Sequence, residues 1–236
     1  MTAPTGAVLE LSGVSKDYHG LRPLRIAALS VQPGEHIAII GLDQATAEVF
    51  VNLVTGATLP DRGEVRLFGR PTSAITDSAD WLAVVDRFGI VSPRAVLLDS
   101  LTVVQNLAMP FTLDIEPPAE DIRRRAVALA EQVGLDAASL DRPVAELPPA
   151  GLVRIRLGRA LALDPAVVIL EHPTAEIPPE AAAELAAECR TISAATITLT
   201  ADAGFAEAAS RRCLTLDPAT GRLAQRTGWL SRLLRG

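Results

Sequence analysis

The spacing of apolar side chains divides the chain into strands and helices. Residues 7–12 and 25–32 alternate apolar and polar side chains, which predicts half-buried antiparallel strands. The continuous apolar run at 36–41 is instead typical of a parallel strand that is covered on both faces. Apolar residues at helical spacing follow in 46–54, and Gly56 can end that helix. We therefore expect a strand, a loop and a helix in succession, beside an antiparallel β-subdomain.

The rest of the chain contains further elements of both kinds. Predicted strands occupy residues 64–68, 88–92, 166–170, 194–199 and 213–216. Predicted helices occupy residues 119–133, 151–162, 179–190 and 203–210. Because strands that alternate with helices form parallel sheets, this order predicts a parallel α/β core.

A helical pattern dominates the middle of the chain. It covers residues 101–134, interrupted by three prolines, and we expect Asp99 and Ser100 to cap its first helix. We interpret 95–150 as a helical subdomain inserted into a single domain that spans residues 1–236.

Composition and charge exclude several classes of protein. The 236 residues can bury a large core, but charges interrupt every apolar run, so we expect no membrane span. The net charge of −6 argues against a nucleic-acid partner, which requires a basic surface. The N-terminus shows no signal-peptide pattern, and Cys189 and Cys213 make no disulfide framework, so we expect a cytoplasmic location. Lys16 is the only lysine, so no displaced lysine can bind a phosphate elsewhere.

Three motifs follow one another in the second half of the chain. Residues 147–151 are Leu-Pro-Pro-Ala-Gly, residues 158–165 are Gly-Arg-Ala-Leu-Ala-Leu-Asp-Pro, and an apolar run then ends at Glu171 and His172. This order and spacing resembles the ATP-binding subunit of ABC transporters. The resemblance covers about residues 7–226 and implies a P-loop NTPase-like (RecA-like) parallel sheet with an antiparallel β-subdomain and an inserted helical subdomain.

The family's phosphate loop falls on residues 41–49. Such a loop binds a triphosphate through helix N-terminal amides, glycines, a lysine and a hydroxyl on Mg²⁺. Gly41 is kept, but other positions differ: Gln44 and Thr46 replace glycines, Ala47 replaces the lysine and Glu48 replaces the hydroxyl residue. The resemblance therefore implies at most weak binding of ATP and magnesium, through Gly41 and Thr46, and we expect no bound cofactor and no metal.

The loops with which this family contacts its partners are altered as well. Pro93 replaces the glutamine that ligates Mg²⁺, whereas the segment after it matches the family. We expect Pro93, Arg94 and Leu98 to contact a partner; the alternative is that they only pack the subdomain. The signature-loop positions are Leu147, Pro148, Pro149, Ala150 and Gly151. Proline at two of them removes a hydroxyl and two N–H donors, so this loop cannot complete a partner's site in the family's manner.

The family's catalytic positions carry other side chains here. The resemblance places Glu171 at the magnesium-organising aspartate, His172 at the general base, Ala201 at the sensor histidine and Pro178 at a dimer-contact aspartate. We expect no catalytic residue among them. His172 could in isolation act as a base, but an ordinary strand-end histidine is the alternative. Tyr18 fits the aromatic residue that stacks on adenine, or else is a packing residue.

These observations lead to three functional hypotheses. The first is a non-hydrolysing ABC-type subunit, a pseudo-ATPase, that dimerises with itself or an active relative. It would support a membrane transport or envelope complex, with transmembrane permease subunits, at the inner face of the cell membrane. The second is a slow, atypical ATPase that powers transport, and the third is a soluble regulatory binding module. For the tail, 227–236, we predict a contact with another chain or the bilayer through an apolar stripe around Trp229, with docking on its own domain as the alternative.

Overall fold

The computed structural model of the chain describes residues 6–226. The predicted contact of the tail, 227–236, therefore lies outside the described residues. Within 6–226, no helix is long and apolar enough to cross a membrane.

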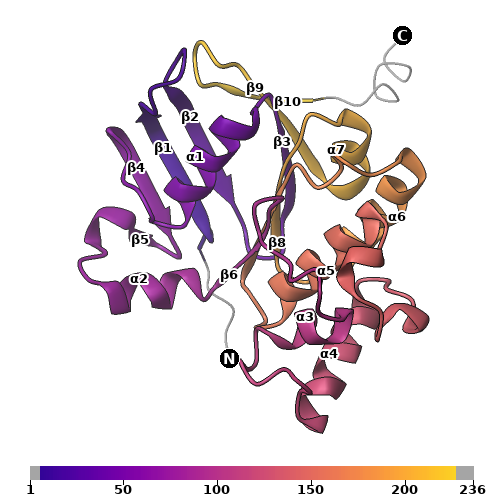
Figure 1. The fold of residues 1–236 in the computed structure, drawn as a ribbon. Coiled ribbons are helices and arrows are strands. Elements are labelled where there is room, and N and C mark those ends of the chain that lie inside the picture. The colour runs from indigo at the N-terminus through magenta and orange to yellow at the C-terminus, as the bar shows by residue number, and fades with distance from the viewer. Residues whose placement is uncertain (1–5, 227–236) are drawn as a thin grey trace.

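Two β-sheets form the framework of the molecule (Figure 1). The larger sheet has six strands in the order β10-β9-β3-β8-β7-β6, all parallel except β10. Its strands are β3 His36–Ile40, β6 Phe88–Val91, β7 Val167–Glu171, β8 Ala195–Leu199, β9 Arg212–Leu216 and β10 Leu223–Gln225. The smaller, antiparallel sheet has the order β2-β1-β4-β5. Its strands are β1 Leu9–Lys16, β2 Leu24–Val31, β4 Arg62–Leu67 and β5 Arg70–Pro71. The predicted parallel core and antiparallel β-subdomain are both confirmed.

Seven α-helices surround these sheets within the described residues. They are α1 Gln44–Val54, α2 Ser78–Val85, α3 Val103–Ala108, α4 Glu120–Gln132, α5 Pro149–Leu161, α6 Pro179–Cys189 and α7 Ala203–Ala209. Helix α5 begins two residues before the predicted start, because Pro149 occupies its first position, where a fixed φ and a missing N–H are tolerated. The expected cap of the first central helix was wrong: Thr102, in a capping box with Gln105, caps α3.

Sequence patterning missed three elements, α2, β5 and β10. Helix α2 has only eight residues and none of them is fully buried, although Trp81, Val84 and Val85 are half-buried on one side. Asp77 nevertheless caps it by accepting a hydrogen bond from the backbone N–H of Asp80, at 2.9 Å. Strand β5 has two residues, and β10 is an edge strand of three partly or fully exposed residues. Short, exposed elements lack the periodicity on which such predictions depend.

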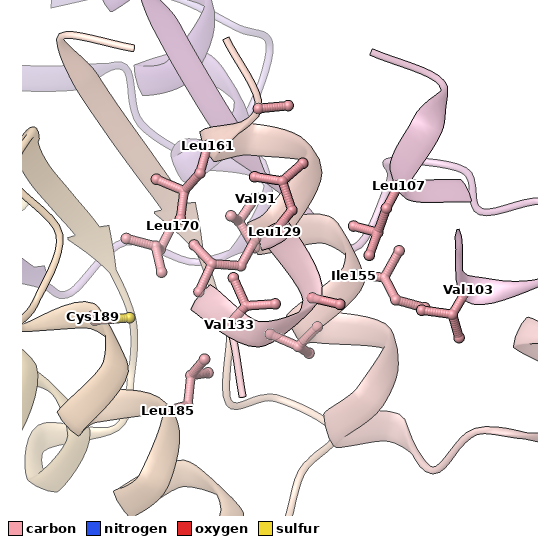
Figure 2. Close-up of a cluster of buried hydrophobic side chains, with 14 of the residues drawn as sticks. Val91, Val103, Leu107, Leu129, Val133, Ile155, Leu161, Leu170, Leu185 and Cys189 are labelled. Atoms are coloured by element: carbon pink, nitrogen blue, oxygen red, sulfur yellow. The ribbon is translucent and has the colours of Figure 1, made fainter. Parts of the chain in front are cut away.

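Two large buried clusters hold most of the elements in place. One lies around α1, which packs against β2, β4 and β7 and so joins the two sheets. The other contains Leu107, Leu129 and Ile155 from the central helices together with Val91 and Leu170 from the large sheet (Figure 2). Because the central helices share a core with β6 and β7, the loop that leaves β6 has a defined position beside the end of β7.

Candidate functional site

The loop from β3 into α1 occupies the phosphate-loop position. Gly41 adopts a φ of 104°, and a Cβ there would lie 3.0 Å from the carbonyl oxygen of Leu216, so the close turn requires glycine. Asp43 caps α1: its carboxylate accepts hydrogen bonds from the backbone N–H of Thr46 at 2.8 Å and from the Thr46 hydroxyl at 2.6 Å. These hydrogen bonds to Thr46, from its hydroxyl first and then its amide, hold the pKa of Asp43 below the ordinary value. The helix N-terminus thus has an anion from its own chain.

The lysine position contributes no charge to this loop. Ala47 is fully buried and belongs to the core around α1. Its backbone N–H donates to the carbonyl oxygen of Asp43 at 2.8 Å, within the helix. The next residue, Glu48, is exposed, and its carboxylate forms an ion pair with Arg94.

Arg94 forms ion pairs with two carboxylates from different elements. Its Nη1 lies 2.5 Å from Oε1 of Glu48 on α1, and its Nη2 lies 2.7 Å from Oε2 of Glu171 at the end of β7. Ser92 supports the arrangement, since its hydroxyl accepts hydrogen bonds from the backbone N–H of Arg94 at 3.2 Å and from Nε at 3.3 Å. A single guanidinium therefore joins the loop after β6, the strand β7 and the helix α1.

Glu171 and His172 form a buried polar corner at the carboxyl end of β7. Glu171 is 0% exposed, and its Oε1 has no hydrogen-bond partner among the described residues. His172 adopts a φ of 44° and donates its backbone N–H to Leu199 at 2.8 Å, while its ring Nε2 is buried and has no partner within 6–226. Both residues line a cavity of about 300 Å³, together with Gln44, Ser92, Pro93 and Arg156.

The three residues predicted to contact a nucleotide lie together. Tyr18, Gly41 and Thr46 line a second cavity, of about 370 Å³, which also includes Asp43 and Arg22. Partial burial, followed by the nearby charge of Asp43, raises the pKa of the Tyr18 hydroxyl. The structure thus brings these residues to one place, with an acidic group among them.

The remaining predicted positions lie at helix starts. Pro148 is the N-cap of α5 and Pro149 its first residue, and neither cap position offers a side-chain hydrogen bond. Leu147 packs on Gly151, where an added Cβ would lie 2.8 Å from the leucine side chain. Pro178 is the N-cap of α6, and Ala201 is exposed beside Asp202, the N-cap of α7. None of these residues lines either of the two cavities described above.

The predicted partner-contact loop lies beside a groove. Arg156 donates from Nε to the carbonyl oxygen of Ala95 at 3.2 Å, and Arg159 donates from Nη1 to that of Val96 at 2.8 Å. These bonds fix the loop on α5. The groove has a volume of about 390 Å³ and includes Ala95, Met109, Pro110, Arg156, Arg159 and Leu163. Val96 and Leu98 are exposed next to it in the sequence.

Sequence reasoning missed the ion pairs of Arg94 and the cap formed by Asp43. We predicted Arg94 as a partner contact, which stays a prediction; within the chain its guanidinium pairs with Glu48 and Glu171. One signal was present: two magnesium-ligand positions carry glutamate, and an arginine follows the proline at the third. Complementary charges at positions that meet in space favour an ion pair.

The fold and these motifs define the class of protein. Residues 24–175 match the family model described as ABC transporter, and the chain belongs to this family. A similar curated protein is the methionine import ATP-binding protein MetN of Brucella abortus (strain 2308), 31% identical over 192 residues, which are 81% of this chain and 51% of MetN. The chain thus spans about half the length of the MetN relatives that it matches. It is also 29% identical to the lipoprotein-releasing system ATP-binding protein LolD of Saccharophagus degradans, over 78% of this chain and 80% of LolD.

Solved structures show the same fold. CbiO1 from Clostridium perfringens, described as part of the ABC transporter complex cbiONQ, superposes with a TM-score of 0.79 at 20% identity, covering 98% of this chain and 91% of its own. The ATP-binding cassette MJ0796, dimeric and bound to ADP and Pi, superposes with a TM-score of 0.74 at 20% identity, covering 94% of this chain and all of its own.

The residues of this site do not fit a magnesium-bound triphosphate. Asp43 accepts hydrogen bonds from the Thr46 amide and hydroxyl, Ala47 supplies no cation, and Arg94 pairs with one oxygen of each carboxylate at the magnesium-ligand positions.

Proposed function

We propose that this chain is a non-hydrolysing ABC-type subunit that dimerises and supports a membrane transport or envelope complex. The observation that carries the proposal is the ion-pair group of Arg94, Glu48 and Glu171, which commits the magnesium-ligand positions to a side chain. Its place would be the inner face of the cell membrane, beside transmembrane permease subunits.

Electrostatics at the phosphate loop supports weak or absent nucleotide binding. A carboxylate about 4 Å from a phosphate oxygen costs about 4 kcal/mol at an effective dielectric near 20. Asp43 lies in the loop itself, and residues 41–49 contain no lysine to offset its charge. Water screens this exposed carboxylate, so the cost at Asp43 is a fraction of that figure. Two further features disfavour phosphate binding: the loop lacks the lysine, and the Thr46 amide already donates to Asp43.

The groove beside Arg156 and Arg159 supports a structural role with a membrane partner. Arginine side chains on α5 fix its loop through backbone carbonyls, Leu163 presents an exposed apolar side chain in the groove, and Val96 is exposed on the adjoining loop. The names of the relatives point the same way: one serves methionine import, one a lipoprotein-releasing system, and CbiO1 is part of a transporter complex. The dimeric cassette MJ0796 supports a paired arrangement.

Co-purification from membranes tests this proposal. Full-length protein should co-elute with a permease subunit, and the complex should show no ATP turnover that depends on this chain. Leu163→Glu, in the groove, should reduce co-elution at least tenfold, whereas Leu59→Glu, an exposed leucine in the loop after α1, should not. Equal recovery of the permease with both variants would contradict the proposed groove contact.

A slow ATPase is the second candidate, favoured by the unpartnered atoms of Glu171 and His172 beside one cavity. A fluorescent-ATP titration with Mg²⁺ separates the two functions. Binding at micromolar concentration, with turnover that His172→Ala removes, would establish the second and reject the first.

A further inference from the structure

We infer that the guanidinium of Arg94 takes the place of the divalent metal ion that the family binds at this site. Its ion pairs then hold the loop after β6, which in the family contributes a metal ligand. The inference deepens the proposed function, and rests on it only in that the site holds no magnesium-bound nucleotide. It concerns the chain's own residues and requires no partner.

Both metal-ligand positions contribute one oxygen each to the same guanidinium. Oε1 of Glu48 and Oε2 of Glu171 lie 2.5 and 2.7 Å from the two terminal nitrogens of Arg94. A planar guanidinium can bridge two carboxylates, which suits this geometry. The cation therefore lies between the oxygens that a metal at this place would need.

Burial explains why a cation is required here. Glu171 is fully buried at the end of β7, and a buried carboxylate without a counter-charge is strongly destabilising. Arg94 supplies that charge from a partly exposed position, with its own backbone and Nε bonded to the buried Ser92 hydroxyl. Ser92 thus fixes the backbone and Nε of Arg94, and the two carboxylates fix its terminal nitrogens.

The consequence concerns the loop that follows β6. Through Arg94 it is tied to α1 and β7, and through Arg156 it is tied to α5 at Ala95. Its conformation is then set by intramolecular bonds rather than by a bound nucleotide. A partner that docks on this loop would meet one fixed surface.

Manganese binding, followed by electron paramagnetic resonance, tests the inference directly. Arg94→Ala leaves Glu48 and Glu171 facing the vacated space, so the variant should bind Mn²⁺ at least about tenfold more tightly than the unchanged protein, since cation affinity rises with the count of free carboxylates. Adding Glu48→Gln to Arg94→Ala should remove that gain. Arg156→Ala is the matched control: this arginine lines the same cavity as Glu171 but donates to a backbone carbonyl and frees no carboxylate, so its loss should raise Mn²⁺ affinity far less than Arg94→Ala does.

Three results would overturn the inference. One is a folded Arg94→Ala variant, verified by circular dichroism, with the Mn²⁺ affinity of the unchanged protein. Another is equal affinity in Arg94→Ala with and without Glu48→Gln, which would place the ion elsewhere. The third needs no change at Arg94: Mn²⁺ binding by the unchanged protein that Glu48→Gln weakens would show that the site already takes a metal. None of these assays involves a permease, so their outcome does not depend on whether the proposed transport role is correct.

Discussion

Removing Arg94 should destabilise the protein far more than removing its outer partner, Glu48. In Arg94→Ala, Oε2 of the fully buried Glu171 loses its partner, while Oε1 already has none among the described residues. Deleting one member of a buried ion pair costs about 3–5 kcal/mol. Because the Arg94 side chain is 37% exposed and water can reach its place, we expect about 3 kcal/mol.

Glu48→Ala should have a much smaller effect. The Glu48 side chain is 48% exposed, and exposed ion pairs contribute less than about 1 kcal/mol. Arg94 retains Glu171 in this variant, so the buried carboxylate stays paired. The double variant Arg94→Ala with Glu171→Gln removes the buried charge and should recover about half of the loss caused by Arg94→Ala alone.

Urea denaturation followed by circular dichroism measures all three differences, provided that the m-values agree. For a chain of this size, a loss of 3 kcal/mol corresponds to a melting temperature about 6–12 °C lower. Similar free energies of unfolding for Arg94→Ala and Glu48→Ala, within about 1 kcal/mol, would refute the argument that Glu171 depends on Arg94.

Three further predictions follow from the site and the core. Asp43→Ala should cost about 1 kcal/mol at pH 7, as the loss of a helix cap does. Because the folded pKa of Asp43 is lowered, its contribution is present above the unfolded value of 3.8 and is lost as pH falls through the folded value. Urea titrations at pH 7 and pH 3 should therefore show the difference shrinking; a constant difference would exclude the carboxylate. Restoring the family's residues by Ala47→Lys and Glu48→Ser should leave the Kd for Mg-ATP above about 1 mM, because Asp43 and Arg94 remain; calorimetry giving less than 0.1 mM would contradict this. Burial raises the pKa of the Cys189 thiol to about 12 and also raises that of Cys213, so thiol reagents at pH 8 should label neither before unfolding.

Long, buried elements were predictable from the sequence because burial creates their periodicity. Strands β3, β7 and β8 lie within one or two residues of the predicted segments, and nearly all their side chains are buried. Helix α2 was missed because it is short, has no fully buried residue and begins at a single side-chain cap, Asp77. The cap of α3 was misplaced because Asp99, Ser100 and Thr102 are all suitable residues, and only the reciprocal bonds with Gln105 identify the third.

Sequence matching identified family positions but not the pairing between their side chains. The matched motifs assigned Glu48 and Glu171 to two magnesium-ligand positions of the family. They could not indicate that Arg94 would turn its guanidinium between them, because that depends on the path of the loop after β6 and on its contact with Ser92. Asp43 is similar: an aspartate before a helix suggests a cap, but its use of the Thr46 hydroxyl as well as the amide is a property of the folded loop.

Under the proposed function, each ligand that the family binds at this site has an internal counterpart of the same charge in this chain. Loss of the metal alone would leave the buried Glu171 without a cation, and Arg94 supplies one. Loss of the phosphate alone would leave the first turn of α1 without an anion, and Asp43 supplies it. Under the proposed function, these two internal pairings would let the folded form of the cassette depend on neither nucleotide nor metal, which is what a structural subunit requires.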